Sequence, residues 1–196
     1  NRLISGNIIN KYSFNILGGV SKGVKKLEIG GLFNIDRNNV NNCQLAGLFN
    51  IVGGKVNGYQ AAGLINIVND SIKGFQNAGL INITTKQIDG AQIAGLGNIS
   101  KSAKGVQIAG LYNISKTVNG AQIGGLLNVT HTIKGIQIAG LLNVAKIVNG
   151  TQVSGLLNVA QKVKNQIGFI NIADSCSGIP IGFLTIVKNG YHKLEY

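Results

Sequence analysis

The chain has 196 residues, a formal net charge of +12 and 44% hydrophobic residues. Its 29 glycines do not recur at every third position, which excludes collagen, and its periodic hydrophobic residues exclude a disordered segment. The cationic excess favours anionic partners such as nucleic acid, lipopolysaccharide, acidic polysaccharide or an anionic membrane face, although lysines spread along a chain also serve plain solubility.

Residues 1–27 are the least regular part of the chain. Phe14-Asn15-Ile16 resembles Phe33-Asn34-Ile35, but the two lie 19 residues apart instead of 16. Terminal repeats of stacked proteins are normally atypical, because they shield the open end of the core. We therefore expect residues 1–27 to be an N-terminal cap or a junction to an upstream domain. Because the chain begins at Asn1 without a methionine or a signal peptide, we also expect it to be a fragment of a longer protein.

Residues 28–172 are built from one repeated unit, Gly-Leu-X-Asn followed by isoleucine or valine, where X varies. The unit recurs first at steps of 16 residues and then at steps of 15. Its glycines are Gly31, Gly47, Gly63, Gly79, Gly95, Gly110, Gly125, Gly140 and Gly155. A fixed period of this kind is typical of stacked repeats in which each unit contacts only its neighbours.

The segment Gly120–Val129 illustrates one unit. It is too short and too rich in glycine for a helix, and its branched residues favour a strand. Three apolar positions recur along the array: the isoleucine after the glutamine (Ile123 here), the leucine of the motif (Leu126) and the residue that ends it (Val129). We expect these three positions to form the core, so that each unit has one long strand, one short strand and two turns.

The two turns differ in what they tolerate. The segment after the motif varies in length, since Ile83–Ile88 is one residue longer than Ile114–Val118, which is typical of a turn. The second turn carries a glycine, such as Gly120, that suits a positive φ. Where this glycine is missing, Asn42 and Asn165 take its place, and asparagine also tolerates the left-handed region.

Two arrangements of the strands are compatible with this pattern. Antiparallel hairpins would supply two strands per unit. Near-identical units instead favour parallel stacking of each strand on its own copy, because equivalent amides then hydrogen-bond along the axis. One such ladder contains Asn34, Asn50, Asn66, Asn82, Asn98, Asn113, Asn128, Asn143 and Asn158, and a second contains Gln44, Gln60, Gln76, Gln92, Gln107, Gln122, Gln137 and Gln152. We therefore predict an all-β fold, a parallel β-solenoid of about 10–12 coils.

Residues 173–196 depart from the repeat. Ile181–Ile186 is an imperfect copy of the unit in which Thr185 replaces the asparagine. Asn189-Gly190 is a strong hairpin signal between two alternating segments. We expect a hairpin of Ile181–Lys188 and Tyr191–Tyr196 to cover the edge of the last coil.

The sequence contains no recognisable catalytic or metal-binding pattern. The six acids do not recur at one repeat position, which argues against paired catalytic carboxyls and against calcium-binding repeats. His131 and His192 lack partners at metal-ligand spacing.

Cys43 and Cys176 lie too far apart along a solenoid to form a disulfide. No apolar run reaches the length of a transmembrane helix. We therefore expect no enzyme, no cofactor and no transmembrane helix.

Two surfaces are candidates for binding. The first is the variable position of the motif, an apolar column that faces either a partner or a second core compartment: Phe33, Phe49, Ile65, Ile81, Tyr112, Leu127, Leu142 and Leu157. The second is a lysine edge in the turn of variable length, which suits an anionic ligand: Lys55, Lys86, Lys101, Lys116, Lys146 and Lys162.

Units such as Val106–Asn113 and Ile136–Asn143 resemble a repeat of uncharacterised bacterial surface proteins of the Bacteroidota type. The flanking segments Tyr12–Asn15 and Ser177–Phe183 are similar as well. The resemblance implies a cell-envelope location that is outer-membrane-associated, extracellular or periplasmic. It also implies other envelope proteins, or a following β-barrel domain, as partners.

The repeat and the resemblance together predict a non-catalytic structural or interaction module of a bacterial cell-envelope protein, acting as a spacer, an adhesin or a docking surface. The alternative is a module that binds anionic glycan or lipopolysaccharide through the lysine edge. Nucleic acid is not an expected partner.

Overall fold

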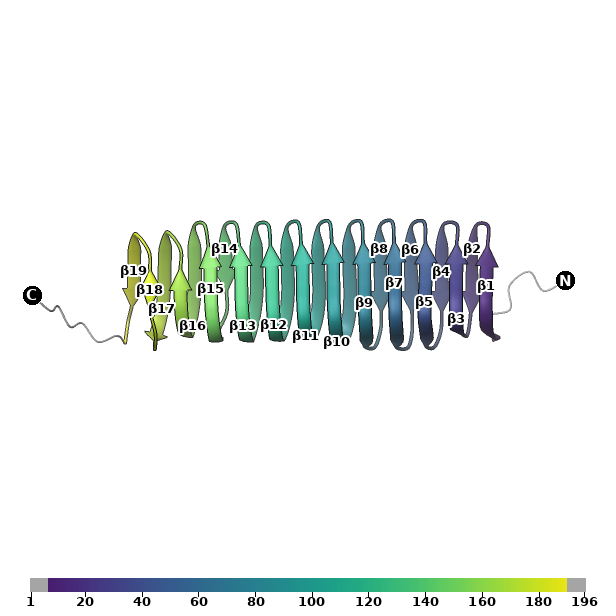
Figure 1. The fold of residues 1–196 in the computed structure, drawn as a ribbon, viewed down its shortest axis with the longest axis horizontal. Helices are drawn as coiled ribbons and strands as arrows, with labels where there is room; N and C mark the ends of the chain where they lie inside the picture. The colour runs from purple at the N-terminus through teal and green to yellow at the C-terminus, as the bar shows by residue number, and fades with distance from the viewer. Residues whose placement is uncertain (1–6, 190–196) are drawn as a thin grey trace, which may run out of the picture.

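The computed structural model describes residues 7–189 as a straight rod of stacked parallel coils (Figure 1). The fold is all-β, with about 12 coils of roughly 15 residues each, and the predicted β-solenoid is confirmed. Each strand pairs with its copy one coil later, so that Asn113 lies beside Asn128 and Gln122 beside Gln137. The alternative of antiparallel hairpins is therefore wrong for these residues.

The strands follow one another without helices between them. They are β1 (Ile9–Asn15), β2 (Gly18–Ser21), β3 (Gly23–Gly30), β4 (Phe33–Asp36), β5 (Val40–Ala46), β6 (Phe49–Val52), β7 (Val56–Ala62), β8 (Ile65–Val68), β9 (Ile72–Ala78) and β10 (Ile81–Ala94). They continue with β11 (Gly97–Ala109), β12 (Tyr112–Gly124), β13 (Leu127–Ala139), β14 (Leu142–Val144), β15 (Ile147–Ser154), β16 (Leu157–Ile167), β17 (Ile170–Cys176), β18 (Pro180–Ile181) and β19 (Leu184–Val187).

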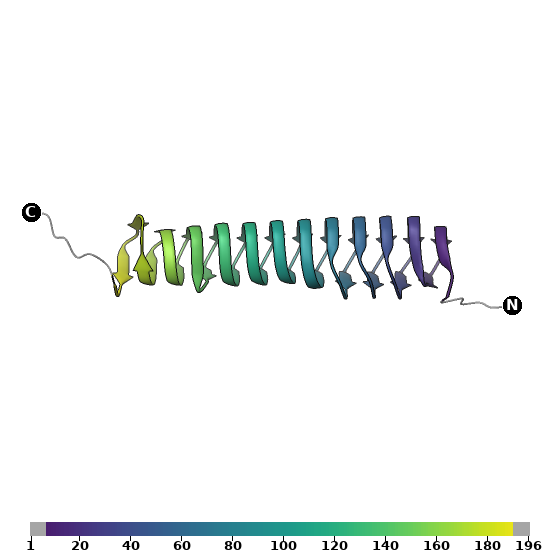
Figure 2. The same ribbon diagram turned by 90° about the horizontal axis from the view of Figure 1, so that it is seen from below.

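Each coil is a flattened loop with two arms, as β6 and β7 show where the arms are separate strands. The short arm has 4 residues (Phe49–Val52) and the long arm has 7 (Val56–Ala62). In β10 to β13 the two arms join into one continuous, curved strand. The tight turns that carry the Gly-Leu pairs lie along the top of the rod in Figure 1, and the wider turns lie along the bottom. We call the first the leucine edge and the second the basic edge; Figure 2 looks at the rod from below, onto the basic edge.

Amides and small or branched side chains fill the interior between the two arms. In the coil of β13, Asn128 and Thr130 point inward from the short arm, and Ile133, Gln137 and Ala139 point inward from the long arm. The fully buried apolar residues lie beside the basic edge in two columns, one on the long arm that includes Val56, Ile72 and Ile88 and one on the short arm that includes Val52 and Val68. The interior is therefore half polar, which is tolerable only because the amides are hydrogen-bonded to each other.

The expected core of leucine, isoleucine and valine is wrong. Leu126 is 41% exposed, Ile108 is 38% exposed, and Val129 is half-buried on the outer surface. Side chains of a strand alternate between its two faces, so an inward Asn128 forces Leu127 and Val129 outward. The interior amides thus decide which face is buried, and the large apolar residues line the outside.

The turn assignments from sequence are largely confirmed. The extra residue of the 16-residue units falls in the basic edge, where the pairing of β10 with β11 shifts between Thr84 and Gln87. Asn42 has φ 73° and replaces the glycine of its column, as predicted. The same prediction for Asn165 is wrong: Asn165 pairs with Thr151 across a register shift, because its coil lacks one residue.

The two ends of the rod continue the same stacking. At the N-terminal end, β1 pairs in parallel with β3 and β2 with β4, with one irregularity between Asn10 and Tyr12. At the C-terminal end, β19 pairs in parallel with β17. The second strand of the predicted closing hairpin, Tyr191–Tyr196, lies outside the described residues. Among residues 7–189, no helix is long and apolar enough to cross a membrane.

Candidate interaction surfaces

The buried asparagines form a continuous hydrogen-bonded ladder along the leucine edge. Each side-chain Nδ2 donates to the Oδ1 of the next asparagine, as from Asn113 to Asn128 at 2.9 Å and from Asn128 to Asn143 at 3.0 Å. The same Nδ2 also donates to a backbone oxygen of the opposite arm, which for Asn128 is that of Ile138 at 2.7 Å. Each asparagine therefore ties two coils together and also holds the two arms of the rod at a fixed separation.

The glutamines form a second ladder that runs in the opposite direction. Nε2 of Gln60 donates to Oε1 of Gln44 at 2.8 Å, and the same bond repeats along the rod to Gln166. Asparagine donors therefore point toward the C-terminal end and glutamine donors toward the N-terminal end. Each ladder therefore ends in an acceptor that receives no hydrogen bond. These acceptors are Oδ1 of Asn34 at the N-terminal end of the asparagine ladder and Oε1 of Gln166 at the C-terminal end of the glutamine ladder, and both are buried.

Two buried acids cap the donor end of the glutamine ladder. Nε2 of Gln44 donates to Glu28 at 2.9 Å and to Asp36 at 2.6 Å, and the hydroxyl of Ser21 also donates to Asp36. Glu28 occupies the glutamine column, and Asp36 occupies the column of Thr130. Glu28 and Asp36 therefore lie together at one glutamine although they share no repeat position. Both are buried, however, and no bond of a substrate can reach them. Their role is to accept the terminal amide hydrogens.

The pH dependence of stability should report this buried pair. Burial, reinforced by Asp36, raises the pKa of Glu28 from its usual 4.5 to about 8. Folded Glu28 binds its proton more tightly than unfolded Glu28, so its contribution to stability is complete below pH 4.5 and is lost as the pH rises toward 8. We expect the free energy of unfolding to fall across this range by up to about 4 kcal/mol.

Urea titrations at several pH values check this expectation. Glu28→Gln should remove most of the slope, because a glutamine does not titrate, whereas Asp89→Asn on the exposed edge should retain it. An unchanged slope in Glu28→Gln would contradict the assignment.

The basic edge gathers the cations of the rod. All lysine and arginine side chains in residues 7–189 are exposed, and they lie in the wide turn or in the first three residues of the arm that follows it. Of the predicted lysine edge, Lys86, Lys101, Lys116 and Lys146 form one column, with His131 between the last two. Lys55 and Lys162 belong to the adjacent column, because Lys162 pairs with Ile147. The predicted edge therefore consists of two columns, side by side.

The long arm adds a third basic column that sequence analysis missed. Lys73, Lys104 and Lys134 occupy equivalent positions in this column, and Asn119 separates the last two. Ion pairs neutralise parts of the edge: Lys86 with Asp70 at 3.0 Å, and Lys188 with Asp174 at 3.0 Å. Residues 90–173 contain no acid, so the middle of the edge is purely cationic. The signal in the sequence was the alternation of lysine and asparagine before the turn glycine.

A shallow groove on the basic edge brings several of these residues together. Its lining consists of Ser71, Lys86, Gln87, Lys101, Ser102, Lys116 and Thr117. Ammonium groups with neighbouring hydroxyls and an amide suit phosphate, sulfate or carboxylate oxygens. Half of the predicted lysine edge therefore lines one groove.

The predicted apolar interface lies on the outer face of the short arm. Its residues, from Phe33 to Leu157, are half-buried by their neighbours in adjacent coils, and the rings of Phe33 and Phe49 stack at 5.3 Å. A second apolar column, including Ile83, Val129 and Val159, runs beside it on the same face. The column thus faces outward and not into a second core compartment.

The leucine edge is an exposed apolar ridge that sequence analysis assigned to the core. Its members are Leu17, Leu32, Leu48, Leu64, Leu80, Leu96, Leu111, Leu126, Leu141, Leu156, Phe169 and Phe183. From Leu32 to Leu141 the leucine N–H groups are nevertheless paired, because Leu126 N donates to Leu111 O at 2.9 Å and the bond repeats from coil to coil. Over these coils the ridge combines exposed apolar side chains with leucine N–H groups that are paired within the rod.

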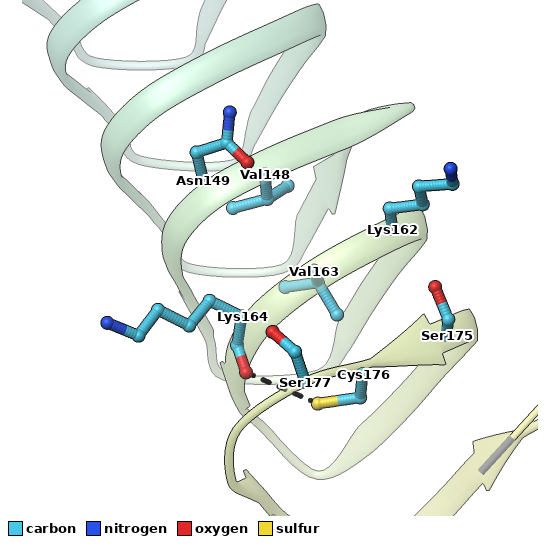
Figure 3. Close-up of a pocket in the computed structure, with 8 residues that line it drawn as sticks. All are labelled: Val148, Asn149, Lys162, Val163, Lys164, Ser175, Cys176 and Ser177. Carbon is cyan, nitrogen blue, oxygen red and sulfur yellow. Dashed lines mark hydrogen bonds between the residues drawn. The ribbon is translucent and has the colours of Figure 1, made fainter.

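A hollow at the C-terminal end of the basic edge contains one of the two free cysteines (Figure 3). Val148, Val163, Ser175 and Ser177 are among its lining residues, and the thiol of Cys176 contacts the backbone oxygen of Lys164 at 3.3 Å. Figure 3 shows the amines of Lys162 and Lys164 directed away from each other. The lining residues include no histidine or acid that would act as a base for the thiol.

Cys43, the other free thiol, lies near the opposite end of the rod, on the outer face of the long arm. Burial raises the pKa of this thiol. In the part of the chain that the structure describes, no three side chains of histidine, cysteine, aspartate or glutamate come together as a potential metal site. Comparison of the chain with protein families, with curated proteins and with solved structures gives no match.

Proposed function

We propose that this chain is a non-catalytic structural and interaction module of a bacterial cell envelope, where it acts as a spacer, an adhesin or a docking surface. The observation that supports this role is the rod itself, which presents the same surface in coil after coil. Two amide ladders span its length and tie each coil to the next. A stack of this kind offers a long, regular surface for binding.

A second candidate function is the binding of anionic glycan or lipopolysaccharide along the basic edge. The observation in its favour is the acid-free stretch of this edge between residues 90 and 173. Lysines in adjacent coils lie only about 4.8 Å apart along the axis, so their charges repel each other in the absence of a counter-charge. An anionic polymer that follows the edge would relieve this repulsion at each coil.

One binding experiment tests both functions. The purified chain is incubated with envelope preparations at low and high salt, in parallel with the Lys101→Gln/Lys116→Gln variant. The interaction-module proposal expects retention by the envelope in all conditions. The glycan proposal expects retention that decreases several-fold with salt and in the variant, because screening weakens contacts between exposed charges.

The outcomes separate the two candidates. Binding that persists unchanged at high salt and in the variant contradicts the role of the lysines but supports a protein interface. A wild-type chain that the envelope does not retain in either salt condition contradicts both.

A further inference from the structure

The apolar surface of this rod is large and continuous. The outer face of the short arm carries two apolar columns, of which the variable one is interrupted only at Gly97 between Phe33 and Leu157, and the leucine edge adds a third. Twelve coils at about 4.8 Å, multiplied by a short arm of about 13 Å, give its outer face an area on the order of 750 Å². Monomers in water rarely expose apolar patches larger than a few hundred Å², so this surface requires a partner.

The exposed charged side chains lie on the basic edge, opposite the leucine edge. From Leu27 to Asn189, every lysine and arginine lies on the basic edge, and the acids lie there too or, like Glu28 and Asp36, are buried. Neither the leucine edge nor the outer face of the short arm carries a charged side chain over this range. A rod surrounded by water has no physical reason to exclude charge from these surfaces, whereas hydrocarbon excludes it strongly.

The backbone of the leucine edge also suits hydrocarbon. Turns usually present free N–H groups to water, and each one would be costly in a lipid phase. Here Gly125 N donates to Ala109 O at 3.0 Å, and Leu127 N donates to Leu111 O at 2.9 Å. The hydrogen bonds run along the rod axis from coil to coil, so the edge enters an apolar phase without leaving these donors unpaired.

We infer that the rod lies in the surface of an anionic lipid bilayer, with its leucine edge inserted into one leaflet and its basic edge among the headgroups. The dimensions agree with this arrangement. The short arm, Leu127–Thr130, spans about 13 Å, which is close to half of the roughly 30 Å hydrocarbon thickness. The lysines of the basic edge then lie at the level of the lipid phosphates, where they are attracted to anionic headgroups. This inference goes beyond the proposed function, because it names a lipid surface and an orientation.

A second copy of the chain fits the same surface less well. Two rods stacked face to face with their edges aligned would bring two lysine edges together, each without an acid between residues 90 and 173. If the edges were reversed, the lysines of one rod would lie beside the leucines of the other. An anionic bilayer complements both the apolar ridge and the cationic edge at once.

Depth-dependent fluorescence tests the orientation. The chain contains no tryptophan, so a single introduced one reports without background. We would bind Leu126→Trp and Lys116→Trp to vesicles of phosphatidylcholine and phosphatidylglycerol that contain lipids brominated deep in the acyl chains. Quenching should be strong for Leu126→Trp and weak for Lys116→Trp. Equal quenching, or the reverse order, would overturn the orientation.

Affinity measurements test the insertion itself. The Leu111→Asn/Leu126→Asn/Leu141→Asn variant changes three exposed residues, so it should fold, and circular dichroism verifies this. Its affinity for the anionic vesicles should fall by at least about tenfold, because apolar area buried in lipid is lost. The matched Lys101→Gln/Lys116→Gln/Lys146→Gln variant should lose the preference for phosphatidylglycerol over pure phosphatidylcholine.

Two results would overturn the inference and identify the alternative. If the leucine variant binds vesicles like the wild type, or if only a soluble anionic glycan binds, the leucine edge does not insert. If the wild type sediments as a dimer without vesicles, fails to bind them, and the leucine variant is monomeric, a second copy covers the ridge.

Discussion

Replacement of Asn128 by leucine should destabilise the rod by about 3 kcal/mol or more, even though it adds an apolar side chain to the interior. The change leaves Asn113 Nδ2 without its acceptor, Asn143 Oδ1 without its donor and the backbone oxygen of Ile138 without its partner. Each buried polar group that loses its hydrogen bond costs about 1–3 kcal/mol. The ladder is interrupted at the centre of the rod, where both neighbouring coils depend on it.

The matched control is Leu126→Asn, two residues earlier. Leu126 is exposed at the leucine edge, so the same chemical exchange in the opposite direction should change the free energy of unfolding by about 0.5 kcal/mol or less. Urea denaturation measures both variants, and hydrogen exchange reports whether the coils beside residue 128 open first. A Leu126→Asn variant that is less stable than Asn128→Leu would restore leucine to the core and contradict the amide interior.

Gly125→Ala should damage the rod severely although it adds only one methyl group. A Cβ atom on Gly125 would overlap the backbone oxygen of Gly110, and the same overlap recurs for Gly140 on Gly125. Hydrogen bonds fix the backbone on this edge, since Gly125 N donates to Ala109 O, so the clash cannot relax without separating two coils. We expect a loss of about 3 kcal/mol or more in the free energy of unfolding.

Gly97→Ala supplies the comparison for this effect. Gly97 occupies the variable column, where neighbouring coils carry Ile81 and Tyr112. The atoms nearest to a Cβ there belong to the ring of Tyr112, a side chain that can shift, and not to fixed backbone. We expect this variant to lose less than about 1 kcal/mol. Equal losses for both variants in thermal or urea unfolding would show that the close coil contact at Gly125 does not limit stability.

The candidate binding surfaces were only partly predictable. The lysine edge was visible in the sequence, because Lys86, Lys101 and Lys116 follow the repeat period. The full width of this edge could not be predicted from the sequence, because the third column alternates lysine with asparagine and contains an acid at Asp89. The cap formed by Glu28 and Asp36 was missed for a different reason. The two residues are 8 apart in sequence, and only the fold of the arms across the interior brings them to the same glutamine.

The sequence by itself determined the coil length, the parallel stacking, the two turns and the two amide ladders of this protein. These features are all consequences of periodicity, and a period of 15 or 16 residues with equivalent asparagines has few other solutions. Only the tertiary structure decided which side of each strand faces inward.

Hydropathy alone assigns Leu126 to the interior, but Asn128 and Gln137 occupy it, and a buried amide is tolerated only where it is hydrogen-bonded, as it is along the two ladders. Once Asn128 and Gln137 point inward, strand alternation places the apolar columns on the outer surface. The cations lie in the wide turn or next to it, on one edge, and this makes the rod amphipathic across its width.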